Sequence, residues 1–437
     1  MPDQPQGASH RLPIRPIVVS VCACAAFVAL SFVRFPGVRA EVVDVARLSV
    51  GALGFKPILS AFVLTELVAA FVPGLRPLRY SIEGRARLRH FSFLLAISFA
   101  TIQTIGFVRY AQAIHLVHEP SVFEPSAYNP YFVMAGLLML GVIATMTLAW
   151  IIDVAGIGVG YSLLLVATIV SALVRTLPAV AEVDALTPTV VLVCAFAFAS
   201  YRMLRSRAVV GTSARYRVPT AGVEPVHQAI VVALLALESP FARSFFWRLV
   251  PEAISRSAVT LALQLVLTVS LSKLFSNIFH RPATEEDGVA LKKATRKSTI
   301  WLCALVLGAA YANQVASVPV VFDWLMLTAL VAVGMDLTSE LRAHWQHGPQ
   351  HALRVVHRLE DADALCAQLQ AAGIATSLRG ANHRALYHFF APFIPIGVLV
   401  PKAEADRAEF ISLEHARTSS APPPLPETAD QGVPAPG

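Results

Sequence analysis

Long apolar runs, separated by short polar segments, dominate the sequence as far as residue 337. An α-helix needs about 20 apolar residues to cross the hydrocarbon core of a bilayer, and many of these runs approach that length. They cover residues 16–33, 57–72, 91–108, 132–150, 161–178, 187–204, 224–238, 257–277, 299–316 and 321–337. The pattern predicts an all-α polytopic membrane protein with ten transmembrane helices. The seventh run gives the weakest signal, because it is short and carries Glu224 and His227.

Composition and charge agree with a chain whose main solvent is lipid. Hydrophobic residues make up 56% of the sequence and charged residues 14%, and the mean hydropathy is +0.61. The net charge of +7 reflects 35 Lys and Arg against 28 Asp and Glu, and the basic residues concentrate in the loops after the second, sixth and eighth runs. Because basic loops stay in the cytoplasm, this alternation places both termini there.

After the tenth run the pattern changes to that of a small soluble domain. Its predicted elements are strand, helix, strand, strand and helix, at residues 354–359, 360–372, 374–378, 394–400 and 402–413, with Gly373 as the stop of the first helix. This βαββα order is enough for a two-layer α+β domain. We therefore predict a cytoplasmic N-terminus over 1–15, a membrane domain over 16–346, a small cytoplasmic domain over 347–415 and a disordered tail over 416–437.

Short motifs lie in an order and spacing that are typical of one family. They are Phe35–Val38 (FPGV), Ala52–Ala61 (ALGFKPILSA), Glu83–Arg85 (EGR), Gln103, Gly156–Leu163 (GIGVGYSL), Val218–Pro225 (VPTAGVEP) and Leu330–Asp336 (LVAVGMD). Over about residues 11–346 the chain thereby resembles SecY, the pore subunit of the bacterial protein translocase. The motifs suit a channel, because glycine pairs allow helices to approach closely and prolines at helix starts break the backbone beside protein or water.

The resemblance implies a SecY-like fold of two pseudo-symmetric halves around a central pore, in the bacterial inner membrane. It implies a protein-conducting channel for the translocation or membrane insertion of polypeptides, with no enzymatic activity, metal or cofactor. The implied partners are SecE-like and SecG-like subunits and a SecA motor or a ribosome. The family's pore ring maps onto Leu59, Val63, Leu165, Ile169, His227 and Ala329, its lateral gate onto Thr65 and Gln103, and its cytosolic docking surface onto Arg205, Arg207, Arg215, Arg217, Lys292, Lys293 and Arg296.

Several features depart from the family's pattern. Only fifteen residues separate Gly37 from Leu53, where the family places its plug helix, so we expect a short or absent plug. The docking loops after the sixth and eighth helices are also shorter. His227 replaces an apolar ring residue, and Glu224 lies three residues earlier on the same helical face. These two side chains form either a mutually satisfied pair or a pH-responsive constriction.

The small domain adds a second resemblance. Residues 357–374 followed by 398–408 are similar to a family of small signal-transducing domains whose ligand is generally unknown. A regulatory or assembly protein on a SecY scaffold is therefore an alternative to a channel. A secondary transporter is another, since transporters also use broken helices and ionisable residues near the midplane. The sequence has no Walker A loop, GxSxG elbow or HExxH motif, so three common enzyme classes lack support.

Overall fold

The computed structural model of this chain is mostly helical and contains two small sheets. It describes residues 13–33, 35, 49–54, 56–79, 82–113, 130–181, 186–210, 214–238, 256–280, 285–315, 324–388 and 394–420. Residues 36–48, where the family carries its plug, and residues 421–437 of the predicted tail lie outside this description. The short plug and the disordered tail therefore stay predictions.

A helix lies over each predicted apolar run in the part of the chain that the structure describes. These helices are α1 (Ile14–Leu30), α2 (Lys56–Phe71), α3 (Ile82–Ala113), α4 (Pro130–Ala155), α5 (Gly160–Ala181), α6 (Leu186–Arg205), α7 (Glu224–Glu238), α10 (Arg256–Phe279), α11 (Glu285–Val315) and α12 (Trp324–His347). Among the described residues, three stretches are long and apolar enough to cross a bilayer: Gly84–Ala113, Tyr131–Ala155 and Ser257–Phe279. That all ten helices span the membrane stays a prediction.

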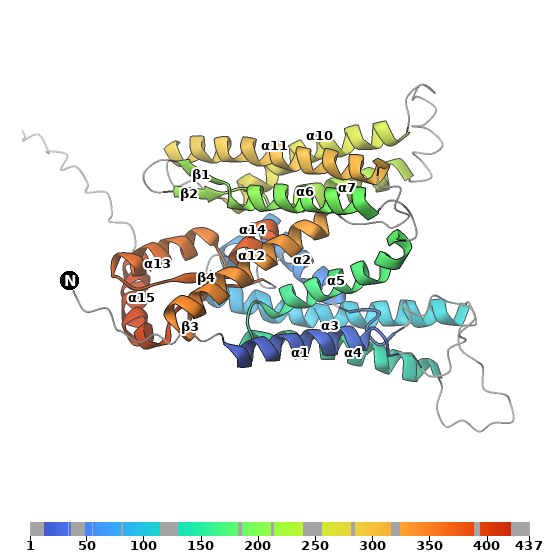
Figure 1. The fold of residues 1–437 in the computed structure, drawn as a ribbon, viewed down its shortest axis with the longest axis horizontal. Helices are drawn as coiled ribbons and strands as arrows, with labels where there is room; N and C mark the ends of the chain where they lie inside the picture. The colour runs from blue at the N-terminus through green and yellow to red at the C-terminus, as the bar shows by residue number, and fades with distance from the viewer. Residues whose placement is uncertain are drawn as a thin grey trace, which may run out of the picture.

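The helices form two groups with a middle layer between them (Figure 1). Helices α1, α3 and α4 lie on one side, α6, α7, α10 and α11 lie on the other, and α2, α5 and α12 run between them. We call α1–α5 the first half and α6–α12 the second half. Helix α12 contacts both α5 and α6, so it joins the two halves. The main apolar core also crosses this boundary, because it contains Phe62 on α2, Leu164 on α5 and Ala329 on α12.

The small domain follows α12 directly. Its elements are β3 (Gln350–Val356), α13 (Leu359–Ala371), β4 (Ser377–Arg379), α14 (Ala381–Leu386), β5 (Ile396–Pro401) and α15 (Ala405–Ser420). The strands form an antiparallel sheet in the order β3-β5-β4, and α13 stops at Gly373, whose φ is +80°. Helix α14 was not predicted from the sequence pattern. The last helix was also predicted to end too early, because α15 continues into the predicted tail as far as Ser420.

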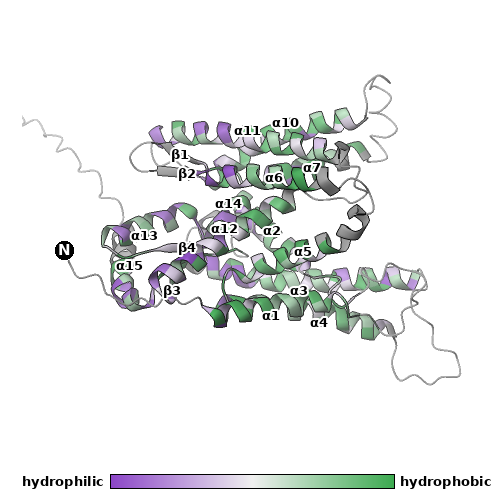
Figure 2. Ribbon diagram, in the orientation of Figure 1, coloured by the Kyte–Doolittle hydropathy of each residue, from purple (hydrophilic) through white to green (hydrophobic). Residues whose placement is uncertain are grey.

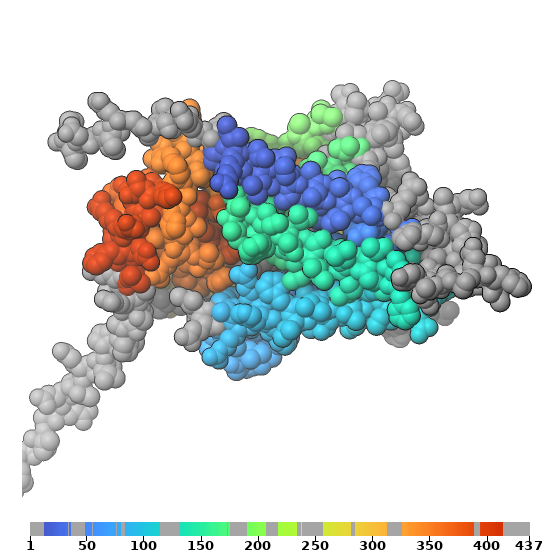
Figure 3. Space-filling model, turned by 90° about the horizontal axis from the view of Figure 1, so that it is seen from below, coloured from blue at the N-terminus to red at the C-terminus, as the bar shows by residue number. Residues whose placement is uncertain are grey.

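Polar residues concentrate at one end of the molecule (Figure 2). The small domain lies at that end, together with the start of α11 and an antiparallel hairpin of β1 (Arg207–Val210) and β2 (Ala214–Arg217). A view from below shows the same arrangement, with α12 and the small domain beyond one end of α1, α3 and α4 (Figure 3). The fold thus gathers the polar residues of distant segments at the ends of the apolar helices.

Candidate functional site

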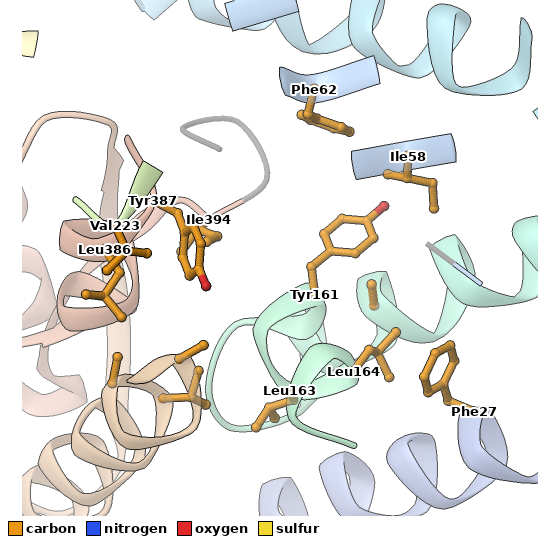
Figure 4. Close-up of a cluster of buried hydrophobic side chains, with 14 of the residues drawn as sticks. Phe27, Ile58, Phe62, Tyr161, Leu163, Leu164, Val223, Leu386, Tyr387 and Ile394 are labelled. Carbon is orange, nitrogen blue, oxygen red and sulfur yellow. The ribbon is translucent and has the colours of Figure 1, made fainter. Parts of the chain in front are cut away.

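Apolar side chains fill the contact between the two halves, and most of the predicted pore ring is among them. Ile58 and Phe62 of α2 lie opposite Tyr161 and Leu164 of α5 in this cluster (Figure 4). Of the predicted ring residues, Ala329 is buried in the cluster and three half-buried side chains pack against it, namely Leu59, Leu165 and Ile169. The ring position Val63 is half-buried on α2.

The sixth predicted ring residue, His227, has a neighbour that the sequence did not suggest. Its ring stacks on Tyr387 of the small domain, with ring centroids 6.0 Å apart and planes 23° apart. The expected neighbour, Glu224, is buried at the first position of α7. No sequence pattern relates residue 387 to residue 227, so only the tertiary structure places the small domain beside this part of α7.

Glycines explain why the two most distinctive motifs have their composition. Gly158, in the turn before α5, has a φ of +81°, and Gly222, before α7, has a φ of +67°, which only glycine adopts readily. A Cβ at Gly160 would overlap the carbonyl group of Ala149, so α5 starts against α4 only because residue 160 has no side chain. The Gly160 amide donates to Asp153 Oδ1 at 2.6 Å and satisfies one amide at the helix start.

Helix α2, which carries the predicted lateral-gate residue Thr65, has an apolar contact near that residue. Leu67 of α2 packs against a cluster that contains Ala221 and Phe275, the latter on α10. Of the predicted gate residues, Thr65 is buried and donates its hydroxyl hydrogen to the carbonyl one turn earlier at 2.8 Å. Gln103 is half-buried on α3.

A buried carboxylate anchors the basic segment that follows α2. Glu66 is fully buried and accepts hydrogen bonds from Arg79 Nε at 3.1 Å and from Arg85 Nη1. Arg85 Nε also donates to the carbonyl oxygen of Arg79 at 2.6 Å. In the sequence these arginines contribute to the basic loop that sets the topology, and Arg85 also ends the EGR motif. The structure shows that they also neutralise a charge inside the protein, where an unpaired carboxylate would be very costly.

Some of the predicted docking residues are exposed to solvent, and others already bind another part of this protein. Lys292, Lys293 and Arg296 are exposed, but they lie in α11, which begins at Glu285, and not in a loop. Arg205 is exposed and donates to the hydroxyl of Tyr201 at 2.8 Å. Arg207 and Arg215 lie in the hairpin of β1 and β2.

Arg217, another of the predicted docking residues, is paired within the protein itself. Its Nη2 donates to Asp363 Oδ1 of α13 at 2.8 Å, and its side chain is only 11% exposed. The guanidinium group therefore binds the protein's own small domain. The planar guanidinium group directs two N–H groups at the two carboxylate oxygens, and such charge-assisted hydrogen bonds are stronger than neutral ones.

A second ion pair joins the small domain to α12. Glu340, which is almost fully buried, accepts hydrogen bonds from Arg379 Nε at 3.0 and 3.1 Å and a further one from Arg379 Nη2. Glu340 Oε2 also accepts the amide hydrogen of Gly158, before α5, at 3.1 Å. The Glu340 carboxylate on α12 thus binds both the small domain, through Arg379, and the turn before α5 in the first half, through Gly158.

The end of α10 provides a third link. His280 Nδ1 lies 2.6 Å from Glu360 Oε1 of α13, and its Nε2 lies 2.8 Å from the carbonyl oxygen of Thr220. Both partners are acceptors, an arrangement that a doubly protonated imidazole satisfies. Burial raises the pKa of Glu360, but the charges of His280 and Arg358 outweigh it and lower that pKa to about 2. The Glu360 carboxylate is therefore ionised across the physiological pH range.

Acid is expected to loosen α14, because a buried imidazole lies in it. Burial lowers the pKa of His383 to about 3, against about 6.5 for an ordinary histidine. The packed state therefore binds fewer protons than the detached state, and its stability falls as the pH drops below about 6.5. At about pH 5.5 the loss is ~1.4 kcal/mol, or about tenfold in population. The His383 imidazole faces the hydroxyl of Ser162 on α5 and the ring of Tyr387, while Asp336 Oδ2 on α12 accepts the His383 backbone amide hydrogen.

Hydrogen exchange of residues 381–388, corrected for intrinsic rates, measures this effect at about pH 7.5 and about pH 5.5. Protection should fall at the lower pH. Burial also lowers the pKa of His388 in the same segment, so the variant with His383→Gln and His388→Gln is the control that should lose the pH dependence. Equal protection of the wild type at both pH values would contradict the prediction.

The long apolar helices, the packed contact between two halves and the polar end define a multi-pass helical membrane protein. The model of the SecY family matches residues 49–285 of the 437. This chain belongs to the SecY family, whose members are multi-pass proteins of the bacterial inner membrane.

Curated relatives match over a shorter stretch. The protein translocase subunit SecY of Aquifex aeolicus is 30% identical over 139 residues, which are 29% of this chain and 30% of the relative. The same subunit of Buchnera aphidicola subsp. Schizaphis graminum is 28% identical over 137 residues, which are 30% of this chain and 31% of the relative. The matched stretch thus spans less than a third of either relative.

Solved channel structures are also similar to the chain. Sec61 of the canine ribosome-channel complex from the endoplasmic reticulum matches with a TM-score of 0.49 and 10% identity, covering 78% of this chain and 95% of that one. A structure described as a protein conducting channel matches with a TM-score of 0.47 and 11% identity, at the same coverage.

Proposed function

We propose that this chain is a channel subunit through which polypeptides cross or enter the bacterial inner membrane. The observation that carries the proposal is the apolar cluster between the halves, to which α2, α5 and α12 contribute Leu59, Leu165, Ile169 and Ala329. Apolar contacts are non-directional, so such a cluster can close around an extended chain of any sequence and close again behind it. The family membership supports the same function.

The proposal includes a topology and partners. Ten spans with both termini in the cytoplasm follow from the positions of the basic residues. SecE-like and SecG-like subunits would brace the halves, and a SecA motor or a ribosome would supply the driving force. The exposed Lys292, Lys293 and Arg296 on α11 are the surface that such a partner would meet, since the Arg217 side chain is already paired with Asp363.

A stalled secretory polypeptide tests the channel directly. A photo-crosslinker at Leu165, in the contact between the halves, should react with the polypeptide in the purified and reconstituted protein. The same crosslinker at Ile143, which is 55% exposed on α4, is the matched control and should not react. No reaction at Leu165, under conditions in which an ordinary SecY reacts at the corresponding position, would exclude the proposed channel.

A regulatory or assembly protein on the same scaffold is the second candidate function. It is favoured by the ion pairs that hold the small domain on the membrane helices, because they fix that domain where an ordinary channel subunit would admit a substrate. In that case the crosslinker at Leu165 stays unreacted even when the small domain has been detached by mutation.

A further inference from the structure

Residues Ala381–His388, which we call the inserted segment, leave the small domain and lie among the ends of the membrane helices. Figure 1 shows its helix, α14, between α12 and α6, another helix of the second half. All of its side chains are buried except that of Asn382, which is half-buried. A polar segment of this kind is normally found on a surface, so its burial needs a specific set of contacts.

The inserted segment touches both halves at once. On the first half, His383 Nδ1 lies 2.6 Å from the hydroxyl oxygen of Ser162, in the first turn of α5. On the second half, the carbonyl oxygen of Leu386 accepts the amide hydrogen of Val223, just before α7, at 2.8 Å. The segment therefore fastens the start of α5 to the start of α7.

Helix α12 holds the first turn of α14. Asp336 Oδ1 accepts hydrogen bonds from the backbone and side-chain amides of Asn382, each at 2.9 Å, and its Oδ2 accepts the amide hydrogen of His383 at 2.9 Å. A helix of six residues is too short to be stable by itself. It forms because a carboxylate from another element satisfies its free amides.

The apolar side chains of the inserted segment belong to two separate cores. Ala381 and Ala385 belong to the small domain's own core, whereas Leu386 and Tyr387 belong to the core between the halves. Figure 4 shows Leu386, Tyr387 and Ile394 beside Val223, across from Tyr161. The domain therefore keeps a core of its own when these side chains leave the membrane part, which makes detachment possible without unfolding.

The inserted segment fills the place where the starts of α5 and α7 meet α12, on the side that carries the predicted cytoplasmic domain. We call this place the mouth and define it as residues 157–162 before and in α5, 220–224 before α7 and 336–340 of α12. All three contact the inserted segment, through Ser162 to His383, Val223 to Leu386 and Asp336 to Asn382. A polypeptide entering from the cytoplasm would have to pass between α5 and α7 to reach Leu59 and Leu165, through the volume that Leu386 and Tyr387 occupy.

We propose that the mouth is a polypeptide-binding surface, and that the chain occupies it with its own inserted segment until a translocating polypeptide displaces that segment. The inference rests on the proposed channel function. The two occupants are mutually exclusive, because interiors packed at protein density leave no room for both. Each therefore lowers the apparent affinity of the mouth for the other.

A disulfide between Val223→Cys and Leu386→Cys tests the competition in the full chain, after the native cysteines have been replaced. The hydrogen bond of 2.8 Å between the two backbones brings these residues within disulfide range. The bond should form in the resting protein, and a polypeptide stalled beforehand should lower its yield by about fivefold or more. Once formed, it should lower the reaction of the polypeptide with the crosslinker at Leu165 by about tenfold or more, and reductant should restore the reaction.

A variant that releases the inserted segment should have the opposite effect. Leu386→Asp places a charge in the core between the halves and leaves the domain's own core intact, so the polypeptide should react at Leu165 about tenfold more than in the wild type. Phe410→Asp is the matched control, because Phe410 is 70% exposed on the same domain and its replacement should change nothing.

The outcomes distinguish a failure of the proposed competition from a failure of the proposed channel function. If the polypeptide reacts at Leu165 equally well with the disulfide closed or open, or if the disulfide does not form in the resting protein, the mouth is not occupied as proposed and the channel still stands. If the polypeptide never reacts at Leu165, in Leu386→Asp included, the channel and the competition both fall.

Discussion

Glu66→Gln is expected to lower the free energy of unfolding by about 3–5 kcal/mol, because it leaves two buried guanidinium groups without a counter-charge. Arg79 and Arg85 are each about 5% exposed, so water cannot replace the lost carboxylate. The midpoint of thermal unfolding in detergent, followed by fluorescence, should fall by on the order of 10 °C. The segment after α2 should also become accessible to protease, since its anchor is gone.

Two further variants show whether the charge is the cause. Glu409→Gln makes the same chemical change at an exposed position of α15 and should leave the midpoint where it is. Replacing Glu66, Arg79 and Arg85 together with methionine should recover most of the lost stability, because a buried ion cluster can be exchanged for apolar groups at little cost. A triple variant as unstable as Glu66→Gln would show that packing, and not charge, sets the effect.

Gly222→Ala is expected to detach the inserted segment. The φ of Gly222 is +67°, and a Cβ there would overlap the carbonyl group of Leu386, which accepts the Val223 hydrogen bond. Backbone strain and overlap together are worth about 2–5 kcal/mol. Most of this can be relieved by moving the inserted segment away, so hydrogen exchange of residues 381–388 should accelerate by about tenfold or more while the helices of the first half keep their protection.

Gly348→Ala separates the effect of backbone strain from the effect of overlap with Leu386. Gly348 has a similar φ of +75°, but a Cβ there would meet no atom within 4 Å. The variant should therefore show the strain of about 1–2 kcal/mol alone, without faster exchange in the inserted segment. Equal exchange in Gly222→Ala and the wild type would mean that the close approach to Leu386 is not a constraint.

The hydrophobic pattern was a good guide wherever a segment's environment is simple. The apolar runs coincide with helices, because a segment in lipid must satisfy its backbone hydrogen bonds internally whatever its neighbours are. The motif glycines were also informative, since Gly158 and Gly222 occupy backbone conformations that other residues avoid. Gly373 was identified as a helix stop for the same reason.

The candidate site was less predictable, because its residues act across long sequence separations. Helix α14 was missed because its sequence has no apolar period, and the carboxylate that stabilises it belongs to Asp336, 46 residues earlier. Arg217 was predicted to lie on a docking surface, and its pairing with Asp363, 146 residues away, could not be foreseen from the sequence. His227 was singled out as a departure from the family, but its stacking on Tyr387 could not be foreseen.

The sequence by itself determined the helical membrane part, the small α+β domain and the membership in a family. Each follows either from local periodicity or from motifs that occur in the order and spacing of that family. Only the tertiary structure decided how the two parts meet. Charged and aromatic side chains such as Arg379, Glu340 and Tyr387 have many possible partners at similar cost. Which contact forms depends on the burial that the whole fold imposes, and no stretch of sequence contains that information.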